Sequence, residues 1–239
     1  MPALSLRSIA PLFALSLLSA GCSAARMQLD PALTAKAPEQ AVSGTAFAAF
    51  RKPVTFGAYT ATLTKGGFQT NKSTSVGPYQ RKESKQAFDF SLVGGTPASW
   101  AGSCAYGTSK QGVLFPISND AGFVCTMVPQ GAGGWQLELK SQGKLYGPNT
   151  LSGSMTDGTT TLSIAMVHKL AGSAFSSSGP VGYEIRDAGG VAVAAVQIFN
   201  PQFVWIDPGL PPEVQTAIAA AAAGLLVSGS AASDINDSR

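Results

Sequence analysis

The chain has 239 residues, of which only 12% are charged, and it contains 27 Gly and 15 Pro. The formal net charge is +3, and the Lys and Arg residues are scattered apart from a group around Arg81, which argues against nucleic-acid binding. This length suits one large domain, and frequent turn-forming residues with few charges are typical of short strands joined by tight turns. We therefore expect a single all-β domain.

The N-terminus has the features of an export signal. Arg7 precedes an apolar run, residues 9–21, which is too short to span a bilayer comfortably and ends in small residues. The sequence "LLSAGC" ending at Cys22 resembles the lipobox of bacterial lipoproteins, although Ser19 stands where that family prefers Leu. The resemblance implies that residues 1–21 are a signal peptide and that Cys22 becomes the acylated, palmitate-bearing first residue. An ordinary cleaved signal peptide is the alternative.

The residue after Cys22 influences the membrane to which such a lipoprotein is delivered. In bacteria with two membranes, the resemblance implies transfer to the outer membrane when this residue is not Asp, and here it is Ser23. We expect a periplasm-facing protein held by its acyl chains, which contribute about 0.8 kcal/mol per buried CH₂. Secretion and inner-membrane anchoring are the alternatives. Residues 22–45, rich in Ala, Pro and small polar side chains, are expected to be a flexible tether.

Two cysteines remain for the folded domain. Cys104 and Cys125 are an even pair, which in an exported protein most simply forms one disulfide. Closing a loop of about 22 residues would contribute about 3 kcal/mol in the chain-entropy model. His168 is the only histidine, so too few soft ligands exist for a tetrahedral zinc centre. We expect neither a metal nor a cofactor.

The middle of the chain is predicted to be a series of β-strands within a domain that spans residues 46–227. Apolar and polar residues alternate in residues 135–139 and 161–169, as in half-buried strands. Residues 182–199 have the pattern of a hairpin with its turn at 187–190. Earlier strands are expected at residues 54–64, 87–93, 103–107, 113–117 and 122–128.

The most apolar segment outside the N-terminus lies near the C-terminus. Pro212 and Glu213 suit the first turn of a helix, which we predict over residues 211–227. Residues 217–227 carry no charge on any face, so the helix must be enclosed. Its length of about 24 Å is short of the roughly 30 Å of a bilayer core, which makes a membrane span the second choice.

A run of five alanines, residues 219–223, makes this helix slender. Small side chains let backbones approach closely, so we expect the helix to run through a closed antiparallel β-barrel. A β-sandwich with the helix packed on one face is the alternative fold. Residues 228–239 are expected to be a disordered tail.

The order of these elements resembles the tubby-like and LURP-one-like barrels, in which a closed sheet surrounds a hydrophobic C-terminal helix. The resemblance covers about residues 46–227 and is carried by "YEIRDAGGVAVAAV" followed by "VWIDPGLPPEVQTAIAAAAAGLLV". It implies a binding, tethering or membrane-associated role. Eukaryotic tubby domains bind phosphoinositides through a basic site, but those residues cannot be matched here, so no ligand residue is assigned.

Residues 65–85 combine basic residues with Phe68 and Tyr79. Such a segment could contact anionic phospholipid headgroups or an envelope protein partner. A solvated hairpin tip, whose charges serve solubility, is the alternative. The candidate contact residues are Lys65, Lys72, Arg81, Lys82 and Lys85.

His168 is the one candidate imidazole base for a hydrolase. It shares strand parity with Ile164 and Met166, which favours a structural role, and the chain has no "GxSxG" elbow. No spacing singles out a pair of carboxylates for glycoside hydrolysis. We expect a non-enzymatic binding or structural module. An envelope hydrolase using His168 and a lipid carrier, in which a lipid displaces the helix, are the alternatives.

Overall fold

A computed structural model describes residues 25–44, 52–113, 115–131, 133–142, 150–177 and 179–233. The strands form one antiparallel sheet in the order β1-β12-β11-β10-β9-β8-β7-β6-β5-β4-β3-β2. They are β1 (Glu39–Ala41), β2 (Val54–Phe56), β3 (Tyr59–Val76), β4 (Tyr79–Val93), β5 (Ser99–Val113), β6 (Phe115–Pro129), β7 (Trp135–Gln142), β8 (Thr150–Thr156), β9 (Thr161–Val167), β10 (Gly182–Arg186), β11 (Ala192–Gln197) and β12 (Phe203–Ile206). The helices are α1 (Pro31–Thr34) and α2 (Pro212–Ser233).

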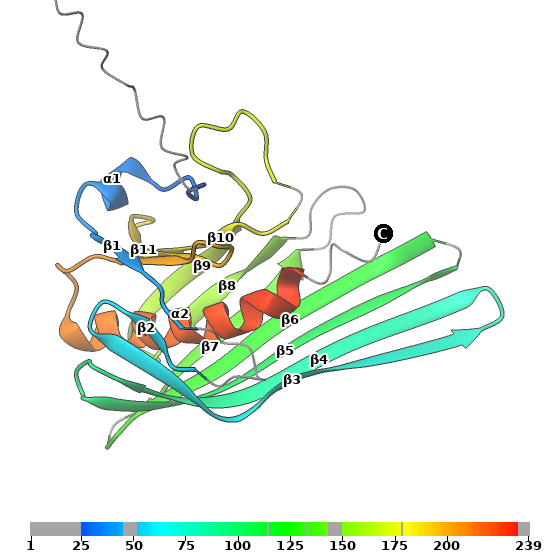
Figure 1. Cartoon of the computed structure of the whole chain (residues 1–239), viewed down its shortest axis with the longest axis horizontal. Coiled ribbons are helices and arrows are strands. Elements are labelled where there is room, and N and C mark those ends of the chain that lie inside the picture. The colour runs from blue at the N-terminus through cyan, green and yellow to red at the C-terminus, as the bar shows by residue number, and fades with distance from the viewer. Residues whose placement is uncertain are drawn as a thin grey trace, which may run out of the picture.

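The two ends of this sheet meet, so the sheet forms a nearly closed barrel (Figure 1). Ser43, which follows β1, and Thr55 of β2 exchange two backbone N–H···O bonds of 2.9 Å. Closure leaves few unpaired strand edges at this seam, which limits edge-to-edge association. The predicted all-β fold, a closed antiparallel barrel with one C-terminal helix, is confirmed.

Helix α2 lies inside the barrel and packs against β3, β4, β5, β6, β11 and β12. Every residue from 216 to 229 is buried. Near the start of the helix, the Thr216 hydroxyl accepts a 3.0 Å hydrogen bond from the Thr96 backbone N–H in the β4–β5 loop. The apolar segment is therefore enclosed by its own domain. It ends at Ser233, so the predicted boundary at residue 227 is wrong and residues 228–233 continue the helix.

The strand pattern follows from which side chains face the helix. In β4, Phe88, Phe90 and Leu92 are buried in the core, while Ala87, which precedes Phe88, is exposed. Strand β11 is buried on both faces, because an outer layer covers it as well as the helix. That explains its continuous apolar sequence, which lacks the alternation of a half-buried strand.

The outer layer is the segment predicted to be a flexible tether, and that prediction is wrong for residues 25–44. Residues 31–34 form α1, whose Leu33 packs in a second cluster with Phe203 and Trp205. The Met27 N–H donates a 2.7 Å hydrogen bond to the buried Gln197 Oε1. The buried apolar residues of this segment are Met27, Leu33 and Ala37, whose spacing has no helix or strand period, so no pattern marks the segment. The described fold begins at Ala25, well before the predicted boundary at residue 46.

Strands β3 to β6 are longer than predicted and extend past the end of α2 (Figure 1). The strands expected at residues 103–107 and 122–128 are parts of β5 and β6. The strand expected at 113–117 is wrong, because β5 ends at Val113 and pairs there with Phe115, the first residue of β6. The strand expected at 54–64 is divided by a turn at Gly57, whose φ of 54° favours glycine.

Candidate functional site

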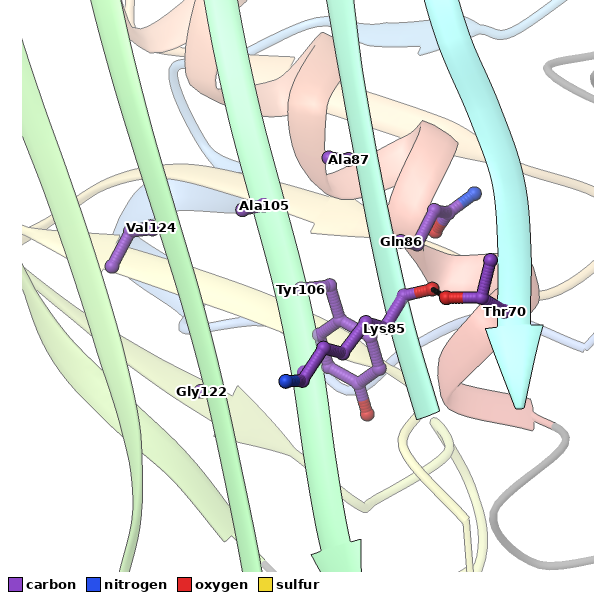
Figure 2. A pocket seen from close by; sticks show the side chains of 9 residues that line it. Thr70, Lys85, Gln86, Ala87, Ala105, Tyr106, Gly122 and Val124 are labelled. Atoms are coloured by element: carbon purple, nitrogen blue, oxygen red, sulfur yellow. Dashed lines mark hydrogen bonds between the residues drawn. The ribbon is translucent and has the colours of Figure 1, made fainter. Parts of the chain in front are cut away.

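A shallow groove of about 590 Å³ lies on the outer face of the sheet across β3 to β6 (Figure 2). Small residues are neighbours there, because Ala87 pairs with Ala105 and Lys85 pairs with Gly107. Exposed positions without large side chains leave the sheet surface hollow. The groove is lined by Thr70, Lys85, Gln86, Ala87, Ala105, Tyr106, Gly107, Gly122 and Val124.

The charges of the groove lie at its rim. The Lys85 side chain is 73% exposed, with its Nζ 3.8 Å from Glu83 Oε2. Glu83 also lies 2.6 Å from an Arg81 guanidinium nitrogen. The Thr70 hydroxyl donates a 3.1 Å hydrogen bond to the Lys85 carbonyl, shown as a dashed line in Figure 2. A largely apolar floor beside an ammonium group suits noncovalent binding of a ligand with an apolar part and an anionic group.

The five predicted contact residues do not lie on one face of the sheet. Because side chains alternate along a strand, Arg81 and Lys85 share the outer face of β4, while Lys82 projects from the inner face. Pairing with Glu83 and Asp89 places Lys72 and Lys65 of β3 on the outer face as well. Four of the five cations are therefore available to an outer ligand and the fifth is not.

Lys82 faces a like charge across the neighbouring strand. It pairs directly with Lys110 of β5 on the inner face. Burial lowers the pKa of Lys110, and the charge of Lys82 lowers this pKa further. An anion between the two ammonium groups would relieve their repulsion. Sequence spacing alone does not reveal that these two lysines are neighbours.

His168 follows β9 and is half-buried. Its Nδ1 lies 3.1 Å from the Gly179 carbonyl oxygen across the β9–β10 loop. Within the described ranges, Nε2 has no hydrogen-bond partner, and no group of His, Cys, Asp or Glu residues could hold a metal ion. The contact between the His168 ring and the Gly179 carbonyl joins the two ends of the β9–β10 loop.

Cys104 and Cys125 are directly opposite each other on β5 and β6, with their sulfurs at disulfide distance. Both are only 3% exposed and face the helix. A Cβ added to Gly224 would lie 3.1 Å from the Cys104 sulfur, so the helix backbone passes close to this pair. Gly224 of α2 is explained by this approach.

Apart from Lys85, the groove residues were missed in the sequence, because small outward-facing residues form no motif. Ala87, Ala105 and Val124 become neighbours only through the register of three strands. The signal that could have found them is a small residue at an exposed strand position, repeated in adjacent strands.

Cys22 and residues 1–21, the predicted signal peptide, lie outside the described residues, which begin at Ala25. Among the helices of the described residues, none combines the length and apolar character that crossing a membrane requires.

Comparison of the chain with protein-family models, with curated proteins and with solved structures found no match in any of the three.

Proposed function

We propose that the protein is an outer-membrane lipoprotein of the bacterial envelope, anchored through Cys22, whose barrel is a non-enzymatic binding or structural module facing the periplasm. The observation that carries the proposal is the position of the lipobox cysteine three residues before Ala25, whose carbonyl accepts a hydrogen bond from Gln197 Nε2 of the barrel. A mature chain beginning at Cys22 would keep every residue that the structure describes. The paired cysteines, Cys104 and Cys125, are compatible with an oxidising compartment.

A tubby-like relationship is part of this proposal. It is supported by the antiparallel strands that surround a C-terminal helix, which is the arrangement the family implies. Fold alone does not assign a ligand. The binding role is instead supported by the outer groove, where Lys85 borders the small residues Ala87 and Ala105.

The enclosed helix favours a module over a lipid carrier. Residues Ala217 and Leu225 are fully buried, and α2 occupies the interior that a carried lipid would need. The hydrolase alternative lacks a comparable observation, because the described contact of His168 is to the Gly179 carbonyl. A hydrolytic triad requires the ring to contact a nucleophile and a carboxylate.

Replacement of Cys22 by Ser is expected to abolish acylation in a bacterium with two membranes. The wild-type chain should lose residues 1–21, incorporate radiolabelled palmitate and fractionate with the outer membrane, because the cysteine sulfur is the site of lipid attachment. The Cys22→Ser chain should incorporate no label. Intact-mass measurement of both chains reports cleavage and acyl content independently of the label.

The matched control is Ser23→Ala, which changes the neighbouring side chain and should keep both label and outer-membrane address. A wild-type chain that is cleaved elsewhere and carries no acyl group would overturn the lipid anchor in favour of an ordinary signal peptide. A labelled chain found in the inner membrane would overturn the proposed address alone.

A further inference from the structure

The segment that joins the acylation site to the domain is very short. Three peptide steps join Cys22 to Ala25, and an extended chain spans at most about 3.6 Å per residue, so the reach is about 11 Å. Ala25 is already held, because its carbonyl accepts a 3.2 Å hydrogen bond from Gln197 Nε2. A lipid on Cys22 therefore fixes which side of the barrel lies against the bilayer.

The surface beside this attachment point is the β9–β10 loop. The Gln28 N–H donates to the Lys169 carbonyl at 2.9 Å, and the Ala171 N–H donates to the Arg26 carbonyl at 2.8 Å. Met27 and Leu170 form an antiparallel bridge between the two segments. Residues 25–28 and 169–171 thus form one unit, and the rest of the loop projects from it.

The loop presents an aromatic side chain to solvent. Phe175 is 83% exposed, more than any other large hydrophobic residue among those described as exposed. Its position is set by a local turn, in which the Phe175 N–H donates to the Ser173 hydroxyl at 3.2 Å and that hydroxyl donates back to the Phe175 carbonyl at 2.9 Å. A side chain held by an ordered turn loses less conformational freedom on insertion than one on a flexible segment.

The composition of this loop suits a lipid surface. Residues 168–177 contain no Asp or Glu, and Lys169 is exposed beside the bridge to residues 25–28. An aromatic ring prefers the interfacial region of a bilayer, and a lysine near the surface is attracted to anionic lipids. Stable membrane attachment commonly combines an acyl anchor with a second contact.

We propose that Phe175, supported by Lys169, inserts into the same phospholipid leaflet that holds the Cys22 acyl chains and so orients the barrel on the membrane. This inference rests on the proposed lipid anchor. With the β9–β10 loop against the bilayer, the long β3–β4 hairpin projects from another part of the barrel (Figure 1). Its tip residue Val76, also apolar and 72% exposed, then remains in water and provides a matched control.

The test uses the full acylated protein, purified from membranes and reconstituted into vesicles of phosphatidylethanolamine and phosphatidylglycerol. Phe175→Cys and Val76→Cys are each labelled with the environment-sensitive dye NBD. Acylation of Cys22 and pairing of Cys104 with Cys125 leave the introduced thiol as the labelling site, and intact mass should show one dye and the acyl chains. Thermal melting confirms that both exposed substitutions leave the fold intact.

The dye at residue 175 should emit at shorter wavelength in vesicles than in detergent-free buffer. Its quenching by spin-labelled lipid should be severalfold stronger than that of the dye at residue 76. An acylated protein whose two dyes are equally quenched, or whose residue 175 stays in water, would overturn this orientation and leave the lipid anchor standing. A mass without acyl chains would overturn both.

Discussion

Replacement of Ala221 by Asp is expected to remove most of the stability of the domain. Ala221 has no exposed surface and lies in the middle of α2, inside the barrel. A carboxylate there would be enclosed by apolar side chains, and an unpaired buried charge costs several kcal/mol even after its pKa has risen. Because domains of this kind are stable by about 5–15 kcal/mol, most of the stability would be lost. Urea unfolding followed by circular dichroism measures the effect.

The control places the same substitution on the other side of the barrel wall. Ala101 of β5 is exposed on the outer face, so Ala101→Asp should change the free energy of unfolding by less than about 1 kcal/mol. If Ala221→Asp unfolded at the wild-type urea concentration, residue 221 would have to reach water and the enclosed helix would be wrong.

Replacement of Gly224 by Leu is expected to lower the free energy of unfolding by about 3 kcal/mol, the upper part of the usual range for overpacking. A Cβ at residue 224 would already lie 3.1 Å from the Cys104 sulfur and 3.4 Å from the Phe123 ring. The three further carbons of Leu would have to displace the strands from the helix. Chemical denaturation measures this loss of unfolding free energy, and the wild-type and Leu chains should show the same dependence on denaturant concentration.

The control for this prediction is Gly224→Ala, which adds the Cβ alone. Its tight contact with the sulfur opposes the better helix propensity of Ala, which is worth about 1 kcal/mol. The Ala chain should therefore stay within about 1 kcal/mol of the wild type. Equal stability of the Leu and Ala chains would show that the helix does not approach β5 and β6 at this point.

The barrel and its helix could be predicted because their signals are local. Residues 217–227 carry no charge on any face, which requires enclosure whatever the surrounding fold. The β10–β11 hairpin was predicted from its turn, where the Asp187 side chain accepts a 2.9 Å hydrogen bond from the Val191 N–H. Alternating residues in β7 and β9 gave correct strands for the same reason.

The features that escaped prediction depend on contacts distant in sequence. Met27 is buried in a cluster with Phe203 and Trp205, and its N–H donates to Gln197, 170 residues away, so its segment shows no pattern of its own. The parts of β3 and β4 that extend past α2 carry polar side chains exposed on both faces of the sheet. Such strands lack the alternation of apolar and polar residues from which a strand is predicted. Strand register, which a sequence pattern leaves open, assembles the groove from Ala87 and Ala105.

Hydrogen exchange of the amides of α2 in the intact domain shows whether the barrel encloses this helix. If the strands enclose the helix, the amides of residues 217–227 should exchange only through global unfolding, as slowly as those of β11, and their rates should follow the urea-dependent stability. Fast exchange in α2 while β5 and β6 stay protected would show that the helix is not enclosed, because it would then leave a barrel that remains folded without it.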